Sequence, residues 1–114
     1  DLHSFPTRRS SDLHIVVELL DDTAMGRAPF GEDEAARLLS SLRSARLLDG
    51  LRGSPPADRA AVVTLLTRLS RLAHDLEDEI LELDVNPVIV GPRGSGAVAA
   101  DALVRLRPAA KEAR

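Results

Sequence analysis

The regular pattern of the chain starts with an apolar run at residues 14–20. A shorter run follows at residues 23–28, and the two acids between them, Asp21 and Asp22, are typical of a turn. We therefore predict two neighbouring strands in this part of the chain.

Apolar side chains recur at helical spacing in two longer segments, residues 32–45 and residues 57–76. The first of these segments begins with three acids, and the helix dipole favours negative charge at an N-terminus. The residues between the segments, 49–57, contain two glycines and two prolines, which predicts a loop. We expect two helices separated by that loop.

Two strand-like runs follow the second helix. The first ends at Val90, the second spans residues 96–106, and a Gly/Pro-rich connection at residues 91–96 joins them as in a hairpin. The resulting order is strand, strand, helix, helix, strand, strand. This order predicts an α+β fold, in which a small antiparallel sheet carries two helices packed on one face.

The strand before Val90 has an apolar face and a polar face, because successive side chains of a strand alternate in direction. The two sets are Leu81, Leu83 and Val85 on one side, and Glu82, Asp84 and Asn86 on the other. Folding the hairpin back would bring Asp101 of the second run close to Asp84 and Asn86. Hard oxygen ligands of this kind suit Mg²⁺, especially when phosphates complete its shell. Spacing alone also fits a simple turn at Asn86 and a solvated carboxylate at Asp101.

Composition narrows the classes of function. With 114 residues, one small domain is the upper limit. The net charge of −3 gives no reason to expect nucleic acid or an anionic membrane as a partner. No apolar run approaches the roughly 20 residues of a membrane span, and without cysteine there is no disulfide or thiol catalysis. A cytoplasmic protein is the default expectation.

Four segments, in this order, resemble the C-terminal part of the ATP-grasp domain of ADP-forming acyl-CoA synthetases (acetate–CoA ligases). The likeness to the succinyl-CoA synthetase beta subunit is more distant. The segments are residues 16–22 with 27–29, residues 47–58, Glu-Leu-Asp-Val-Asn-Pro at 82–87, and Val-Ala-Ala-Asp-Ala-Leu-Val-Arg-Leu at 98–106. The resemblance covers about residues 14–107.

The resemblance implies site residues. In that family the Asn of the acid-x-Asn-Pro motif and the Asp of the next strand hold the Mg²⁺ of Mg-ATP. The corresponding residues here are Asn86 and Asp101. Asp84 stands at the family's acidic position and would act as a third ligand or orient one. Arg52 would either reach a phosphate of the nucleotide or pin its own loop through a salt bridge. The phosphohistidine of the family belongs to another domain, so no catalytic residue is assigned here.

The function implied is phosphoryl transfer from ATP in support of acyl-CoA formation, or the reverse reaction. Its partners would be ATP and ADP, the remaining half of the ATP-grasp domain, and the CoA-binding domains or subunit of the ligase. The fragment alone would be inactive, since half of the nucleotide cleft is absent. Two alternatives stay open: a regulatory ligase-like region fused to a protein-lysine acetyltransferase, and a small non-catalytic domain.

The two ends of the chain lie outside the resemblance. Residues 1–13 resemble a translated sequencing-adapter read-through, and our hypothesis is that they form a non-native tail; a natural polar tail is the alternative. Residues 14–107 would form the ATP-grasp fragment. Residues 108–114 would be a tail or the start of an interdomain linker.

Overall fold

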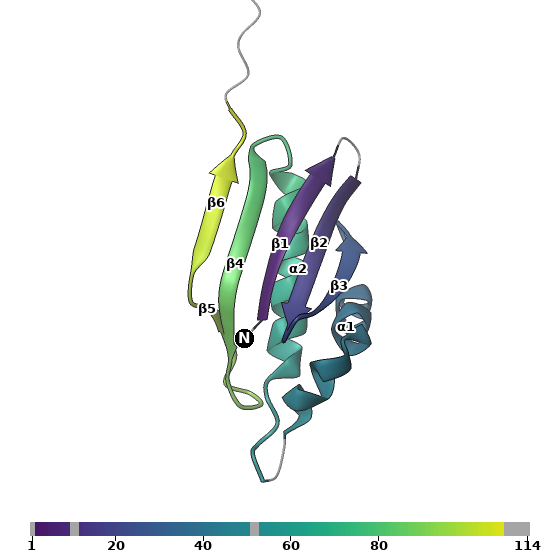
Figure 1. Ribbon diagram of the computed structural model, residues 1–114, viewed down its shortest axis with the longest axis vertical. Coiled ribbons are helices and arrows are strands. Elements are labelled where there is room, and N and C mark those ends of the chain that lie inside the picture. The colour runs from purple at the N-terminus through teal and green to yellow at the C-terminus, as the bar shows by residue number, and fades with distance from the viewer. Residues whose placement is uncertain (1, 10–11, 51–52, 109–114) are drawn as a thin grey trace, which may run out of the picture.

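A single antiparallel sheet organises the chain in the computed structural model, which describes residues 2–9, 12–50 and 53–108. In this part of the chain six strands pair in the order β3-β2-β1-β4-β5, and β6 also pairs with β4. The strands are β1 (Leu2–Arg9), β2 (Asp12–Leu19), β3 (Asp22–Arg27), β4 (Ile80–Val90), β5 (Ala97–Ala99) and β6 (Ala102–Leu106). Helices α1 (Glu32–Ser41) and α2 (Arg59–Asp75) lie on one face of the sheet (Figure 1). The predicted α+β architecture is confirmed.

Helix α1 is shorter than the sequence pattern predicts. It ends at Ser41 because Leu42 is extended, with φ −71° and ψ 134°, and a separate 3₁₀ helix, η1 (Arg43–Asp49), follows. After this break the N–H of Arg43 donates to the carboxylate of Asp22 in β3. The expected helix at residues 32–45 is therefore two helical pieces, and a tertiary hydrogen bond satisfies the backbone where they meet.

The core is aliphatic and lies between the sheet and the helices. Along β2 alternate side chains are buried, as a half-covered strand requires. Close packing of α1 depends on Gly26 in β3, because a Cβ there would lie 2.5 Å from Cδ1 of Leu38. The largest fully buried side chains of the described residues are Ile15, Val17, Leu39, Val62, Leu66, Ser70 and Val88. None of the helices in the described residues is long and apolar enough to cross a membrane.

Strand β1 was not among the expected elements. It lies in the middle of the sheet, where its backbone pairs with β2 on one side and with β4 on the other. Ser4, for example, is the register partner of both Val17 and Val85. Ladder pairing uses backbone groups that every residue except proline supplies in full, so this placement does not bear on the origin of residues 1–13. That origin stays a hypothesis.

A buried hydrogen bond joins α2 to the residues after β3, and its loss should be measurable. The hydroxyl of Ser70, which is fully buried, accepts from the N–H of Phe30 at 2.8 Å. Replacing Ser70 with alanine would leave this N–H without its partner and should lower the free energy of unfolding by about 1–3 kcal/mol. Urea denaturation measures the change. The control is Ser41→Ala on the exposed end of α1, which should shift stability by less than about 0.5 kcal/mol; equal effects of both variants would contradict this account.

Candidate functional site

Strand β4 and its edge partners carry the residues that the sequence singled out. The expected continuous strand at residues 96–106 is two short strands, β5 and β6, which both pair with β4. They are separated at Ala100 and Asp101, opposite the Asn86-Pro87 pair of β4. Because Pro87 has no N–H, the ladder lacks one donor at this point. The break in the edge therefore coincides with the predicted metal ligand.

Asn86 and Asp101 face each other across this break. The N–H of Asn86 donates to the carbonyl oxygen of Asp101 at 3.0 Å, and the N–H of Ala100 donates to the carbonyl of Pro87 at 2.9 Å. Register pairs on both sides, Val85 with Ala102 and Val88 with Ala99, make Asn86 the partner of Asp101. Opposite residues of an antiparallel pair present their side chains on the same face. The structure therefore brings these two exposed residues together, as predicted.

Asp84 joins them from two positions earlier on the same face of β4. It is only half-buried, yet its Oδ1 atom is enclosed and has no hydrogen-bond partner. A buried carboxylate oxygen without a partner is costly, so such an atom points to a missing cation or donor. The unpartnered oxygen of Asp84 is the observation that makes Asp84, Asn86 and Asp101 suitable ligands for a divalent cation.

The donor set is two carboxylates and one amide. No three His, Asp or Glu side chains converge on one point within the described ranges, so a cation here would need the amide oxygen of Asn86. Waters or phosphate oxygens would complete the shell. Mg²⁺ is commonly held in this way, by one or two carboxylates with waters and substrate phosphates. One oxygen of Asp101 also accepts the N–H of Ala102 at 2.8 Å, which limits the rotation of this carboxylate.

Glu82 is the other acid of the predicted polar face of β4, and its carboxylate is ion-paired with Arg105. Its Oε1 lies 3.1 Å from Nη1 of Arg105, the register partner in β6. The register shifts between Ile80 and Glu82, so Ile80 is buried while Leu81, which we expected on the apolar face, is only half-buried. The apolar face is therefore correct at Leu83 and Val85 and wrong at Leu81.

The chain is similar to known proteins. A family profile described as ATP-grasp domain matches residues 14–106. The chain belongs to the ATP-grasp domain family. Residues 1–13 lie outside the matched range.

The ATP-grasp chain has curated relatives among ADP-forming CoA ligases. It is 40% identical over 93 residues to the beta subunit of acetate–CoA ligase [ADP-forming] II from Pyrococcus furiosus, covering 82% of this chain and 39% of that subunit. It is 38% identical over 92 residues to the 4-hydroxybutyrate–CoA ligase [ADP-forming] of Nitrosopumilus maritimus, covering 81% of this chain and 13% of that enzyme. The chain thus spans less than half the length of either relative.

Solved structures share the fold. A Pyrococcus horikoshii protein of known crystal structure superposes with a TM-score of 0.86 and 30% identity, covering 94% of this chain and 48% of that chain. A dinucleotide-forming acetyl-CoA synthetase 1 from Ca. Korarchaeum cryptofilum superposes with a TM-score of 0.84 and 29% identity, covering 93% and 52%. That structure holds coenzyme A and Mg-AMPPCP, with its phosphohistidine segment pointing towards the nucleotide binding site.

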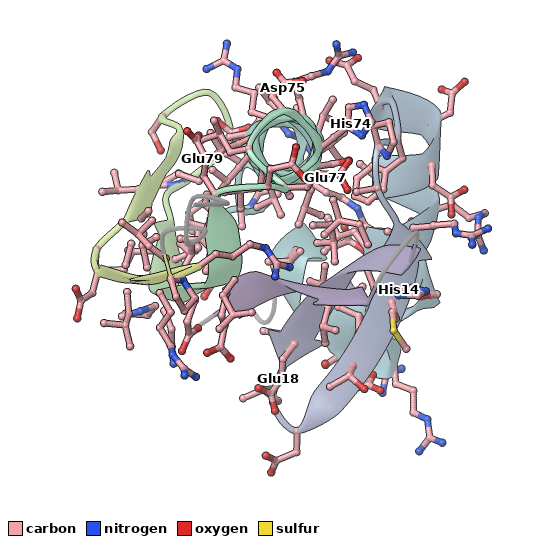
Figure 2. All side chains as sticks on the ribbon, turned by 90° about the horizontal axis from the view of Figure 1, so that it is seen from above. His14, Glu18, His74, Asp75, Glu77 and Glu79 are labelled. Atoms are coloured by element: carbon pink, nitrogen blue, oxygen red, sulfur yellow. The ribbon has the colours of Figure 1, made fainter. Side chains whose placement is uncertain are left out.

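His14, His74 and Glu18 of the ATP-grasp chain belong to elements other than β4, β5 and β6. Figure 2 shows His74 near the end of α2, while His14 and Glu18 project from β2 on the other side of the sheet. Nδ1 of His74 lies 3.9 Å from Oε1 of Glu77. Arg52, the predicted phosphate contact, lies outside the described residues, and its role stays a prediction.

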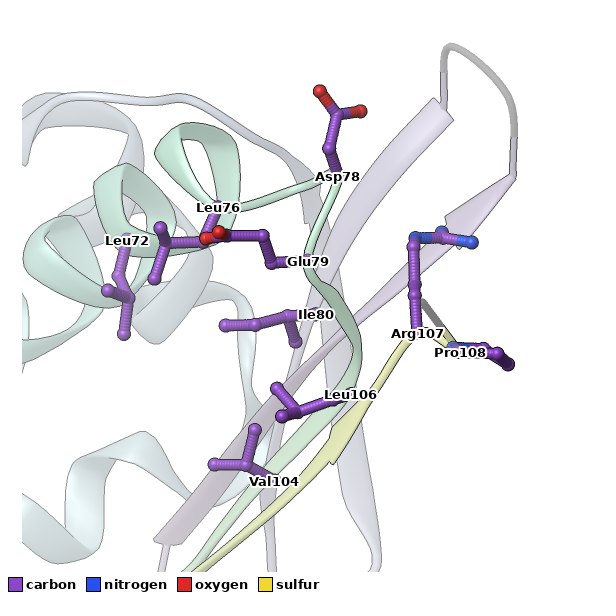
Figure 3. Close-up of a pocket in the computed structure, with 9 residues that line it drawn as sticks. All are labelled: Leu72, Leu76, Asp78, Glu79, Ile80, Val104, Leu106, Arg107 and Pro108. Carbon is purple, nitrogen blue, oxygen red and sulfur yellow. The ribbon is translucent and has the colours of Figure 1, made fainter. Parts of the chain in front are cut away.

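Figure 3 shows the residues that line an apolar groove of about 660 Å³, and the strand register puts this groove on the opposite face from the candidate ligands. It lies between the end of α2 and strands β4 and β6. Val104 lines it and is the register partner of buried Leu83, so the groove is on the helix-covered side of the sheet. Its other lining residues are Leu72, Leu76, Asp78, Glu79, Ile80, Leu106, Arg107 and Pro108. The groove therefore adds nothing to the acid and amide site.

Asp58 is a buried polar residue to which the sequence analysis assigned no role. It is 8% exposed, and its carboxylate caps α2 by accepting the N–H of Ala61 at 3.2 Å. Its position directly before the helix, after Pro56, is a signal that could have identified the cap. No sequence pattern indicates its second contact, the N–H of Gly96 at 2.7 Å.

Proposed function

We propose that this chain supplies the Mg²⁺ site for Mg-ATP in an ADP-forming acyl-CoA synthetase. The observation that carries the proposal is the backbone hydrogen bond from Asn86 to Asp101, which pairs these two residues two positions along β4 from Asp84. Membership of the ATP-grasp family supports a nucleotide, and the relatives among ADP-forming ligases support the reaction class.

The residues of this chain would act by position and charge. Bound Mg²⁺ neutralises phosphate charge and helps align the phosphoryl group for transfer. Asp101 and Asn86 would hold the ion at the break in the edge strand. Asp84 would contribute its enclosed oxygen, either directly or through a water. Asp84 and Asn86 sit on the paired strand β4, and Asp101 is bonded to that strand through its carbonyl oxygen. The three groups would therefore be oriented before the nucleotide arrives, which is how a preorganised site lowers a barrier.

The rest of the enzyme would supply the remaining functions. The beta subunit of the Pyrococcus furiosus ligase is more than twice as long as the part matched here, so we expect the other half of the ATP-grasp domain to complete the nucleotide cleft. The CoA-binding domains or subunit would accept the phosphoryl group and form the acyl-CoA. Arg52 would contact a phosphate. ATP and ADP are the nucleotides, and the acyl acid would be selected outside this chain.

Metal binding tests the proposal in the intact protein that carries this chain. Mn²⁺ serves as the probe, and its affinity in the presence of ATP is measured by electron paramagnetic resonance. Removing an outer-shell partner of a metal typically costs 10–100-fold in affinity, so Asn86→Ala should weaken Mn²⁺ binding at least about tenfold.

The matched control is Glu82→Gln, which changes an acid on the same strand and face that is ion-paired with Arg105. This variant should bind Mn²⁺ as the unmodified protein does. If Asn86→Ala also bound Mn²⁺ normally, the metal would lie elsewhere and the proposal would fail.

A further inference from the structure

Asp58 holds both ends of the hairpin loop that leads from β4 to β5. Its Oδ2 accepts the N–H of Gly96 at 2.7 Å, and its own N–H donates to the carbonyl of Gly91 at 2.7 Å. The remaining oxygen caps α2 through the N–H of Ala61. Asp58 therefore joins the start of α2 to both ends of the loop, through its carboxylate at Gly96 and through its backbone N–H at Gly91.

Neighbouring contacts strengthen the same junction. The N–H of Arg93 donates to the carbonyl of Pro56 at 2.9 Å, and Ala57 forms an isolated β-bridge with Pro92. The loop is closed by the N–H of Gly91, which donates to the carbonyl of Gly96 at 2.9 Å. The loop is thus fixed from outside, by the segment before α2, as well as by its own closing bond.

Strand β5 needs such a fixed point, because it cannot set its own register. It has three residues, its side chains are exposed or half-buried, and Val98 is 63% exposed. Register is specified by burial of one face, so a short exposed strand specifies it weakly. A slip of one residue would put Ala100 opposite Asn86 and turn the side chain of Asp101 to the other face. The position at which β5 starts therefore helps to place Asp101, together with the pairing of the exposed strand β6 with β4 on its other side.

We propose that Asp58 is a positioning residue that fixes the register of β5 and thereby places Asp101 opposite Asn86. The consequence for metal binding rests on the proposed function, whereas the effect on register does not. The inference follows from the two carboxylate contacts and from the five-residue path between Gly96 and Asp101.

Amide hydrogen exchange in this chain tests the register. The variant is Asp58→Ser, whose hydroxyl can still cap α2 but is too short to reach Gly96. The N–H groups of Asn86 and Ala100, which bond across the break, should exchange at least about tenfold faster. Amides in the middle of α2 should keep their protection. In the intact protein the same variant should weaken Mn²⁺ binding about tenfold.

Two further variants sharpen the test. Ser95→Ala removes a side-chain bond to the carbonyl of Pro92 within the same loop and leaves Asp58 in place, so it should change neither readout. Asp58→Asn is nearly isosteric, but its N–H₂ group must face one of the two N–H donors, Ala61 or Gly96. If the serine variant does not fold, this variant should show the same faster exchange at Asn86 and Ala100.

The outcomes separate this inference from the proposed function. Unchanged exchange at Asn86 and Ala100 in both Asp58 variants would overturn the positioning role. Uniform loss of protection across the sheet would also overturn it, because it would show a merely structural role. Selective exchange together with no Mn²⁺ binding by the unmodified intact protein would refute the proposed function and leave the register role intact.

Discussion

Replacing Asp101 with alanine is expected to lower the rate of phosphoryl transfer from ATP in the intact enzyme by at least about 100-fold. A metal ligated at a transferring phosphoryl group stabilises the transition state by several kcal/mol, and each 1.36 kcal/mol corresponds to about tenfold in rate. The variant removes one of two carboxylates from the candidate set. Asp101 is exposed, and its side chain accepts the N–H of the neighbouring Ala102, so the fold should be little affected.

The measurement is the rate of ADP formation from ATP in the presence of CoA and the carboxylic acid, at several Mg²⁺ concentrations. Thermal unfolding of each variant shows whether the fold is retained. Glu82→Gln should keep nearly the full rate, since its carboxylate pairs with Arg105. An Asp101→Ala enzyme that turned over normally at low Mg²⁺ would rule out this residue as a ligand.

The second large effect concerns the core. Leu66 lies in α2 and is fully buried, so its replacement by alanine removes packing and leaves a cavity. Leu→Ala changes at such positions cost about 2–5 kcal/mol. Native domains are stable by only about 5–15 kcal/mol, so a large part of the stability of this chain should be lost. Urea denaturation followed by circular dichroism gives the difference in the free energy of unfolding.

Leu72 provides the matched control in the same helix. It is 39% exposed and borders the apolar groove, so Leu72→Ala removes the same atoms from a partly solvated position. We expect a loss clearly smaller than that of Leu66→Ala, of about 1 kcal/mol. Similar losses for the two variants would mean that the core is not centred on Leu66.

The periodic parts of the fold could be predicted from the sequence. Alternation along β2 and helical spacing along α2 are local signals, and the residues they marked for burial, such as Ile15 and Leu66, are buried. The break at Leu42 could not be predicted, because it depends on a hydrogen bond between Arg43 and Asp22 from another part of the chain. The split of the last strand at Ala100 likewise depends on its partner strand.

The candidate site was predictable in part. Alternation along β4 and the hairpin placed Asp84, Asn86 and Asp101 on one face, and the observed register agrees. Their role as metal ligands stays a prediction. The sequence could have indicated Asp58 as the cap of α2, because capping is a local pattern. It could not have indicated the contact of Asp58 with Gly96, because those residues are 38 positions apart. Such contacts arise only from the tertiary fold.

The central place of β1 means that the sheet is held together by the first residues of the chain. Its backbone is the shared neighbour of β2 and β4, so a chain shortened to begin at His14 would leave two ribbons, β2–β3 and β4–β5–β6, with no ladder between them. Each ribbon would gain an unpaired inner edge, which is a template for association with other chains, and a two-stranded ribbon alone is marginally stable. Another extended segment could take the position of β1 between β2 and β4, because the hydrogen bonds of a sheet join backbone groups and do not depend on particular side chains.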